Sequence, residues 1–486
     1  MERSSGDARR PAQTLILGVG FGVLGDLLFH HSAVGVNAVL WMGPLAIAGW
    51  MAYRRTHRPA GALPGLLVVG VFFAGCLAWR ASPFLSFWNV AAVAASAVAI
   101  AVQLRGTLWS ARIADYLRGA MDAAGDLVAA PVRLLGEVPP SHTGRLARRG
   151  LAILTGVVLA VPVVLVFGAL LVAADASMDA FVRSLFAWDL EAIATHLVIF
   201  GATAWLAAGG LRRIGLAPAA PADVADRPRR SLGTIELGIP LGALTLLLAV
   251  FIGLQIRYLF GGEAFVRVAG VTYAEFARRG FFELVVLSAL TLPVLLAAQH
   301  LVDRGARGSL DSFRALGATI AILVALVMVS ALARMRLYVE TYGLTEDRFY
   351  ATAFMLWLGV VLTWWVITEF RGRLERFATG AVVAGFLLLG GLNAANPDAV
   401  IARVNVARAA AGAELDAEYL SRLGSDAIPV LSSRWARLDH DARCALRGGM
   451  RRAAQRDAGW RAWTWSGWRA TRAARAVSAP LGCAAG

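Results

Sequence analysis

The sequence predicts an all-α, polytopic helical membrane protein of about eleven spans with a small C-terminal helical domain. Hydrophobic residues make up 58% of the 486 residues, and the mean hydropathy is +0.63. A soluble domain contains only roughly 45–50% apolar residues. The apolar residues also gather in runs of about 20, the length that an α-helix needs to cross a bilayer. Most of the chain is therefore expected to be solvated by lipid or by its own spans.

The basic residues favour a membrane topology signal over a nucleic-acid site. All 47 are arginine, and the net charge is +15. Arginines on cytoplasmic loops fix the orientation of spans, so no nucleic-acid partner is expected. The three cysteines, Cys76, Cys444 and Cys483, form no CxxC pair, and this gives no support to a zinc or redox motif.

A multi-spanning domain is predicted over residues 1–392. Its first apolar run contains Asp26 and lacks a small-residue cleavage site, which favours a retained span over a signal peptide. The eleven predicted spans cover 15–29, 34–53, 61–79, 84–104, 151–173, 193–211, 232–256, 280–301, 315–332, 349–368 and 378–392. Residues 105–149 carry too many charges to span and predict a cytoplasmic or interfacial helix. Residues 217–231 are predicted to be an irregular linker.

The distribution of arginines predicts the orientation. Alternate loops, counted from the N-terminus, hold 24 arginines on one side and 9 on the other, and 14 more follow the last span. Positive residues mark the cytoplasmic side. We therefore expect a multi-pass membrane protein whose N-terminus is inside and whose C-terminus is outside. Cys444 and Cys483 would then lie in an oxidising compartment, where they can pair.

Residues 393–486 have the composition of a soluble or membrane-surface helical domain. Helices are predicted from Pro397, over 415–423, after a Ser425 cap, over 439–455 and over 460–477. The last of these carries four tryptophans among arginines. Such a helix can lie on the membrane surface, or its tryptophans can pack on the other helices.

Several ordered stretches resemble a known family. They read YAEFARRGFFELVV from Tyr273, RMRLYVETYGLTEDRFY from Arg334, NAANPDAVIARVN from Asn393 and LDAEYLSRLGSDAIPVL from Leu415, and the tail WRAWTWSGWRATRA adds to them. Over roughly residues 230–475 the chain resembles a bacterial membrane family known as domain of unknown function 4153/4173. The resemblance implies a polytopic membrane protein with a C-terminal helical segment, and it supplies no activity, substrate or cofactor. Gly424 stands where the family pattern leads us to expect a polar residue, and no role is expected there.

A cluster of polar residues is the candidate site. The predicted topology brings the loop before span eight, the loop after span nine and the C-terminal segment to the outer face. The candidate residues are Arg278, Arg279, Glu283, Arg334, Arg336, Tyr338, Asn396 and Asp398. Arginines bind carboxylate or phosphate groups through bidentate hydrogen bonds. The cluster therefore predicts either a pocket for an anionic ligand or lipid headgroup, or ion pairs that tie the loops to the C-terminal helices.

Three classes of function remain open. The first is a non-enzymatic binding or assembly protein of the cell envelope, with the lipid bilayer as its surroundings and no protein partner that the sequence identifies. The second is a secondary transporter, which would use polar residues in or beside spans, namely Asp26, His196, Glu236, His300 and Asp303. The third is a membrane-embedded transferase acting on lipid-linked envelope substrates.

Sequence motifs favour the non-enzymatic class. HExxH, GxSxG and the phosphate-binding GxxxxGK[ST] are absent from the sequence. The histidines, including His30, His31 and His196, have no linear spacing that makes a metal site. No catalytic residue, cofactor or metal is therefore predicted.

Overall fold

The computed structural model describes residues 10–56, 61–106, 108–137, 190–216, 233–260, 281–302, 307–456 and 459–477. These residues are almost entirely helical, which confirms the predicted fold class. Four helices form the N-terminal part: α1 (Arg10–Phe29), α2 (Val36–Arg54), α3 (Leu63–Trp79) and α4 (Pro83–Gln103). They coincide with the first four predicted spans.

Six further apolar helices follow in the described part of the chain. They are α8 (Leu190–Gly215), α9 (Thr234–Phe260), α12 (Phe281–Leu301), α13 (Arg307–Tyr342), α14 (Glu346–Phe370) and α15 (Phe377–Ala395). Among the described residues, nine helices are long and apolar enough to cross a membrane, and the 17-residue α3 is a shorter apolar helix. The predicted span over 151–173 lies outside the described residues.

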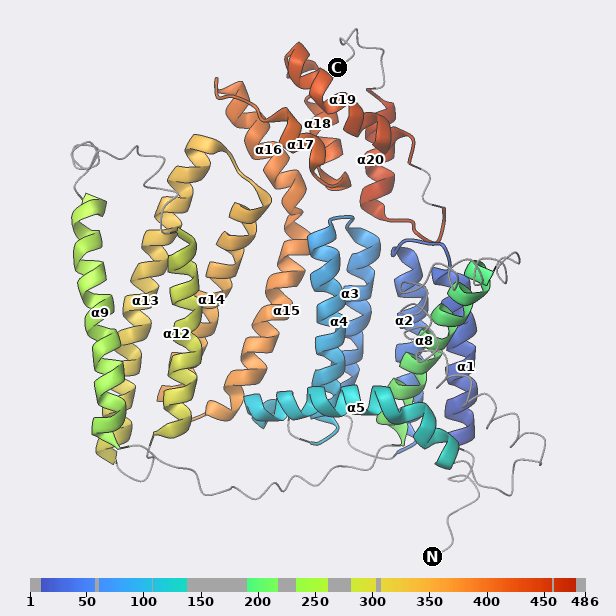
Figure 1. The fold of residues 1–486 in the computed structure, drawn as a ribbon, viewed down its shortest axis with the longest axis horizontal. Coiled ribbons are helices and arrows are strands. Elements are labelled where there is room, and N and C mark those ends of the chain that lie inside the picture. The colour runs from blue at the N-terminus through green and yellow to red at the C-terminus, as the bar shows by residue number, and fades with distance from the viewer. Residues whose placement is uncertain are drawn as a thin grey trace, which may run out of the picture.

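The long helices stand side by side in two groups (Figure 1). One group consists of α1–α4 with α8, and the other of α9 and α12–α15. In the second group, a hydrophobic core includes the fully buried side chains of Phe313, Ile320 and Trp365. The rings of Phe313 and Trp365 meet edge to face with centroids 6.2 Å apart, a favoured aromatic geometry.

Helix α5 (Ile113–Glu137) lies across the ends of the spans, on the face opposite the C-terminal helices (Figure 1). Ion pairs hold it there, because Asp126 pairs with two arginines of α8, Arg213 at 2.7 Å and Arg212 at 3.5 Å. Asp122 pairs with Arg105 after α4. Helix α5 therefore crosses the ends of the other helices, and its place at a membrane surface stays a prediction.

Helix α13 is longer than its apolar run. The predicted span over 315–332 is the middle of a 36-residue helix, so residues 334–342 are helical and do not form the expected loop. Arg336 and Glu340 pair at 2.9 Å across one helical turn, which supports the polar extension. The helix ends where Gly343 adopts a φ of +81°, a conformation that glycine allows at a helix C-terminus.

The C-terminal helices share one hydrophobic cluster. They are α16 (Pro397–Ala410), α17 (Ala417–Arg422), α18 (Ile428–Ser433), α19 (His440–Ala454) and α20 (Trp465–Arg475), with the short 3-10 helix η5 (Ser425–Ala427) before α18. Ile401, Leu420, Leu431 and Leu446 are buried in the cluster. This core explains why three of the five predicted helical segments recur close to their expected bounds.

Two predicted helix starts are wrong. The side chain of Ser425 does not cap α18; it lies within η5 and accepts a hydrogen bond from Arg456. The last helix begins at Trp465 rather than at residue 460, because the Thr464 hydroxyl accepts from the Gly467 amide at 3.1 Å and forms the N-cap. Trp460 and Trp463 therefore stand in the turn before α20.

Candidate functional site

A buried arginine lies where the spans meet the C-terminal helices. Arg80 follows α3 directly, is 6% exposed and caps the C-terminal end of α15. Its Nε donates to the Asn393 carbonyl at 2.6 Å, and its Nη2 donates to the Ala394 carbonyl at 3.4 Å. A guanidinium at this place satisfies terminal carbonyls and complements the negative end of the helix dipole. Arg80 thereby locks the end of α3 to the end of α15.

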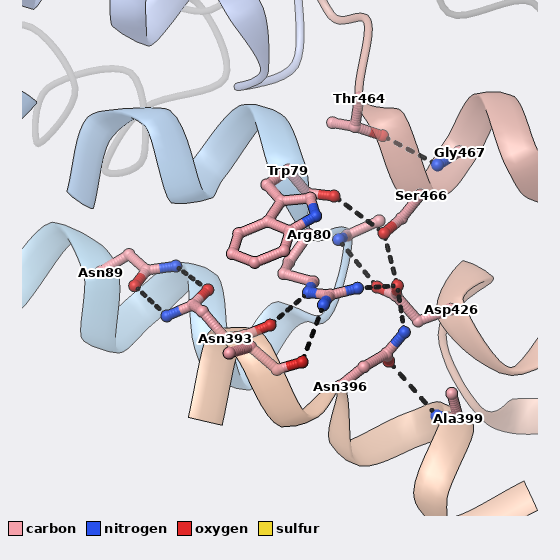
Figure 2. Close-up of polar contacts among 12 residues, drawn as sticks. Trp79, Arg80, Asn89, Asn393, Asn396, Ala399, Asp426, Thr464, Ser466 and Gly467 are labelled. Carbon is pink, nitrogen blue, oxygen red and sulfur yellow. Dashed lines mark hydrogen bonds and ion pairs between the residues drawn. The ribbon is translucent and has the colours of Figure 1, made fainter. Parts of the chain in front are cut away.

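Asp426 of η5 completes this buried ion pair (Figure 2). Its Oδ1 accepts from Arg80 Nη1 at 3.0 Å and from Asn396 Nδ2 at 3.0 Å, and it also accepts from the Ser466 hydroxyl. Its Oδ2 accepts from the Ala81 amide at 3.3 Å. A buried carboxylate persists only when it is paired and hydrogen-bonded in this way. We refer to Arg80, Asn393, Asn396, Asp426 and Ser466 as the Arg80 cluster.

Two asparagines extend the cluster into the spans. Asn89 of α4 and Asn393 of α15 exchange amide hydrogen bonds at 3.1 and 2.8 Å, and both side chains are fully buried. Amide pairs of this kind stabilise the association of helices in apolar surroundings. At the end of α15, Asn396 adopts a φ of +59° and caps α16 by accepting from the Ala399 amide. The pair and the cap fix the direction in which α16 leaves the spans.

Asp398 is the unusual member of this region. It lies in the first turn of α16, is 1% exposed, and neither carboxylate oxygen has a hydrogen bond of normal geometry among the described residues. Burial raises the pKa of Asp398 to about 7, and the negative charges of Glu346 and Asp426 add to this shift. The Gly424 amide and Arg80 offset part of it. The site therefore holds an acid that titrates near neutral pH.

Gly424 has a role that the sequence did not reveal. A Cβ at this position would lie 2.4 Å from Asp398 Oδ2, well inside van der Waals contact. Glycine therefore stands where the family pattern suggests a polar residue because η5 approaches α16 closely. The absence of a side chain at Gly424 makes room for the Asp398 carboxylate.

A polar cavity of about 960 Å³ opens beside the Arg80 cluster. Its wall includes Glu346, Asp347 and Tyr350 at the start of α14, and Gly424 separates it from Asp398. Three exposed arginines of the C-terminal helices also line it: Arg422, Arg452 and Arg456. The cavity thus offers cationic and anionic groups on different structural elements.

An apolar groove of about 510 Å³ lies among α4, α14 and α15. Phe84 and Tyr350 line both this groove and the polar cavity. Their rings stack with centroids 3.7 Å apart and an interplanar angle of 23°. The Tyr350 hydroxyl and the nearby Ser82 hydroxyl are both buried at this point. A stacked aromatic pair therefore stands between a polar space and an apolar one.

The structure separates the predicted polar residues. Arg278 and Arg279 lie outside the described residues. Glu283 is exposed in the first turn of α12, beside Val286 and Leu290. Arg336 is exposed and pairs with Glu340 of its own helix rather than with an acid of the C-terminal helices.

The remaining predicted residues lie at different places. Arg334 is half-buried within α13, and the Tyr338 ring lies 4.0 Å from the Arg348 guanidinium. Asn396 and Asp398 lie at the junction described above, where Asn396 contacts Asp426 directly. Of the six candidates that the structure describes, only these two belong to the neighbourhood of the polar cavity.

The sequence by local pattern did not single out five residues of this site: Arg80, Asn89, Asn393, Asp426 and Ser466. A signal was present for the two asparagines, because each stands within or at the end of an apolar run, where an unpaired amide is costly. Arg80 stands in a short loop between two predicted spans, where an arginine indicates topology and no site. The partnership of Arg80 with Asp426 joins residues 346 positions apart, and no local pattern reports such a contact.

The long apolar helices and their buried polar junction define a polytopic, helical integral membrane protein. Residues 67–433 match the family model described as Domain of unknown function (DUF4153), so the chain belongs to this family. The match reaches further towards the N-terminus than the resemblance noted from the sequence, and it includes Arg80, Asp398 and Asp426. No curated protein and no solved structure matches the chain.

Proposed function

We propose that this protein is a non-enzymatic binding protein for a phosphate-bearing lipid, held at the junction of the spans and the C-terminal helices. The observation that carries the proposal is the meeting of the polar cavity and the apolar groove at Phe84 and Tyr350. A phosphate-bearing lipid likewise joins a polar headgroup to apolar acyl chains. Its headgroup would occupy the polar cavity, and one acyl chain would occupy the groove.

The arginines of the polar cavity supply the affinity for phosphate. Arg452 has no ion-pair partner among the described residues, whereas Arg422 pairs with Glu418 in an exposed position. Guanidinium groups bind phosphate oxygens through bidentate, charge-assisted hydrogen bonds. Glu346 and Asp347 on the α14 side repel a second anion, and this favours a headgroup with an amine or hydroxyl groups beyond its phosphate.

Small residues make the apolar groove deep enough for a chain. Ala91, Ala92, Ala95 and Gly385 line it, and larger apolar side chains surround them. The lining of α4 extends from Phe84 to Ala95, about 16 Å along a helix axis. This length matches a large part of an acyl chain in one leaflet, whose share of the hydrocarbon core is about 15 Å.

The lipid proposal predicts that changes in the polar cavity and changes in the apolar groove each weaken lipid binding. Purified protein is stripped of lipid, incubated with phosphatidylglycerol in detergent, and analysed by native mass spectrometry. The double variant R422A/R452A removes two guanidinium groups and is expected to weaken binding by at least about tenfold, since the loss of even one charge-assisted contact has that effect. At Gly385 a Cβ would meet only the Trp357 nitrogen at 3.9 Å, so the position tolerates a side chain. Gly385→Leu fills the groove and is expected to weaken lipid binding by a similar factor.

Matched variants control for charge and for bulk. Arg336→Ala removes an exposed arginine elsewhere, and Gly65→Leu adds the same side chain at an exposed glycine of α3 with no atom nearby. Both controls are expected to bind like the wild type. The proposal is rejected if R422A/R452A and Gly385→Leu retain wild-type affinity. Equal weakening in all four variants rejects it as well.

The orientation is proposed to place this site outside the cytoplasm, as the arginine distribution predicts. The state of the cysteines supports it: Cys444 is disulfide-bonded and Cys76 is free and buried, while Cys483 lies outside the described residues. Disulfides persist in oxidising compartments.

Reporter fusions test the orientation. A periplasm-active reporter fused after Leu415 is expected to be active, and a cytoplasm-active reporter fused after Arg230 is also expected to be active. Each reporter at the other position serves as the control and should be silent. A cytoplasm-active reporter that works after Leu415 contradicts the proposed topology, and free thiol at Cys444 in protein from oxidising medium argues against it too.

A further inference from the structure

We propose that Asp26, His30 and His196 form a binding site for a divalent first-row transition metal such as Zn²⁺. One ligand atom from each of the three side chains lies within 4.8 Å of the others. The site is far from the Arg80 cluster in the sequence, and it stands independently of the proposed lipid site. Its residues come from the end of α1 and the beginning of α8, which neighbour each other at the face that carries the C-terminal helices (Figure 1).

The end of α1 places two of the ligands on one face. Asp26 and His30 are four positions apart, the spacing at which helical side chains are neighbours. His30 lies just beyond the last residue of α1, and its amide still donates to the Asp26 carbonyl at 3.0 Å. The helical geometry therefore continues to His30.

Close packing between α1 and α8 places the third ligand. Glycines 18, 22 and 25 of α1 face Ala208, Ala204 and Thr203 of α8, and a Cβ on any of them would lie 2.9 Å or less from those side chains. Small residues at this spacing let two helices approach closely in a membrane. The contact holds His196, two turns before Thr203, beside Asp26. The scaffold of the site is thus set by backbone packing and not by the ligands themselves.

The donor set suits a transition metal. His196 Nδ1 lies 2.8 Å from each carboxylate oxygen of Asp26, and the His30 Nδ1 is buried with no hydrogen-bond partner among the described residues. Two imidazoles with one carboxylate bind Zn²⁺ and similar ions, and they leave a fourth position open to water or another ligand. A hard ion such as Mg²⁺ prefers oxygen ligands alone.

The rings must move a short way to bind the ion. The imidazoles of His30 and His196 now stack, with centroids 3.4 Å apart and an interplanar angle of 12°. Coordination directs an in-plane nitrogen of each ring at the same ion, so loading turns at least one ring. His30 stands in the turn between α1 and α2, where its carbonyl accepts from Arg461 at 3.3 Å and its ring contacts the rings of His31 and His196. Rotation of its side chain leaves the close α1–α8 contact intact.

A titration with Co²⁺ tests the site. The full-length protein without a histidine tag is treated with a chelator and titrated with Co²⁺, whose visible absorption reports nitrogen coordination. We expect saturation at one equivalent per chain, with displacement by Zn²⁺. His30→Gln and His196→Gln are each expected to weaken Co²⁺ binding at least tenfold. Zn²⁺ is also expected to raise the Tm of the wild type and not of these variants.

Two histidines outside the trio provide controls. His31→Gln changes the adjacent residue, and His300→Gln changes a histidine in the last turn of α12. Both should bind one equivalent like the wild type. Absence of saturable binding to the wild type refutes the site. Unchanged binding in His196→Gln or in His30→Gln refutes it equally, and because the two changes lie on different helices, a folding defect in one leaves the other as a test.

Discussion

Replacing Arg80 with methionine is expected to lower the free energy of unfolding by about 3–5 kcal/mol and to expose the C-terminal helices to protease. The side chain of Arg80 is 6% exposed and that of its partner Asp426 is 4% exposed. Removal of one member leaves the other charge buried without a counterion. It also leaves the carbonyls of Asn393 and Ala394 without their donor.

The double variant R80M/D426N separates the charge from the packing. Asparagine keeps an acceptor for Asn396 and Ser466 but carries no charge, so this variant is expected to recover a substantial part of the loss. Thermal unfolding in detergent and limited proteolysis measure both effects. Arg336→Ala is the matched control, because its ion pair with Glu340 is 82% and 55% exposed and such pairs contribute about 0–1 kcal/mol. Equal losses in Arg80→Met and Arg336→Ala would contradict the assignment of the Arg80 cluster as the joint.

Replacing Asp398 with asparagine is expected to stabilise the protein above neutral pH, by up to about 4 kcal/mol at pH 8. This figure follows from the difference between the pKa of about 7 in the folded protein and the ordinary value of 3.8, at about 1.36 kcal/mol per unit. The asparagine amide is itself buried without a full set of partners, which takes away about 1–3 kcal/mol of the gain. The expected effect is therefore a rise in stability, in contrast to most core substitutions.

The pH dependence has a definite sign. Between pH 4 and pH 7 the unfolded chain has released the Asp398 proton while the folded protein retains it. Stability therefore falls as the pH rises through this window and levels off above about pH 7. In Asp398→Asn this slope is expected to become shallower. Asp416→Asn, at the exposed N-cap of α17, provides a control that keeps the slope.

Thermal unfolding of the variants from pH 4 to pH 9 checks the prediction. An Asp398→Asn variant that is less stable than the wild type at pH 8 would show that the carboxylate is needed in its ionised form. The same slope in Asp398→Asn and in the wild type would assign the titration to other groups. Either result would contradict the assignment of a raised pKa to Asp398.

The sequence determined the membrane architecture of this protein by itself. Runs of about 20 apolar residues predict spans because no water is available in the bilayer to satisfy exposed backbone groups. Ten of the eleven predicted spans appear as helices, and the remaining one lies outside the described residues. N-caps such as Asp416 and Asp439, and the Pro397 start of α16, also follow from local chemistry. The length of α13 did not follow, because charged residues end an apolar run without ending a helix.

Which polar residues meet depends on how helices that are distant in sequence pack together. Arg334, Arg336 and Asp398 lie on the same predicted face, but a face is wide compared with the 3 Å reach of a hydrogen bond. Arg336 pairs with Glu340 one helical turn away, whereas Asp426 pairs with Arg80, which is far from it in the sequence. The same holds for Asp26 and His196, which meet because glycines bring α1 against α8. Composition and periodicity report how each segment is solvated, whereas a site depends on the packing of segments that are distant in sequence.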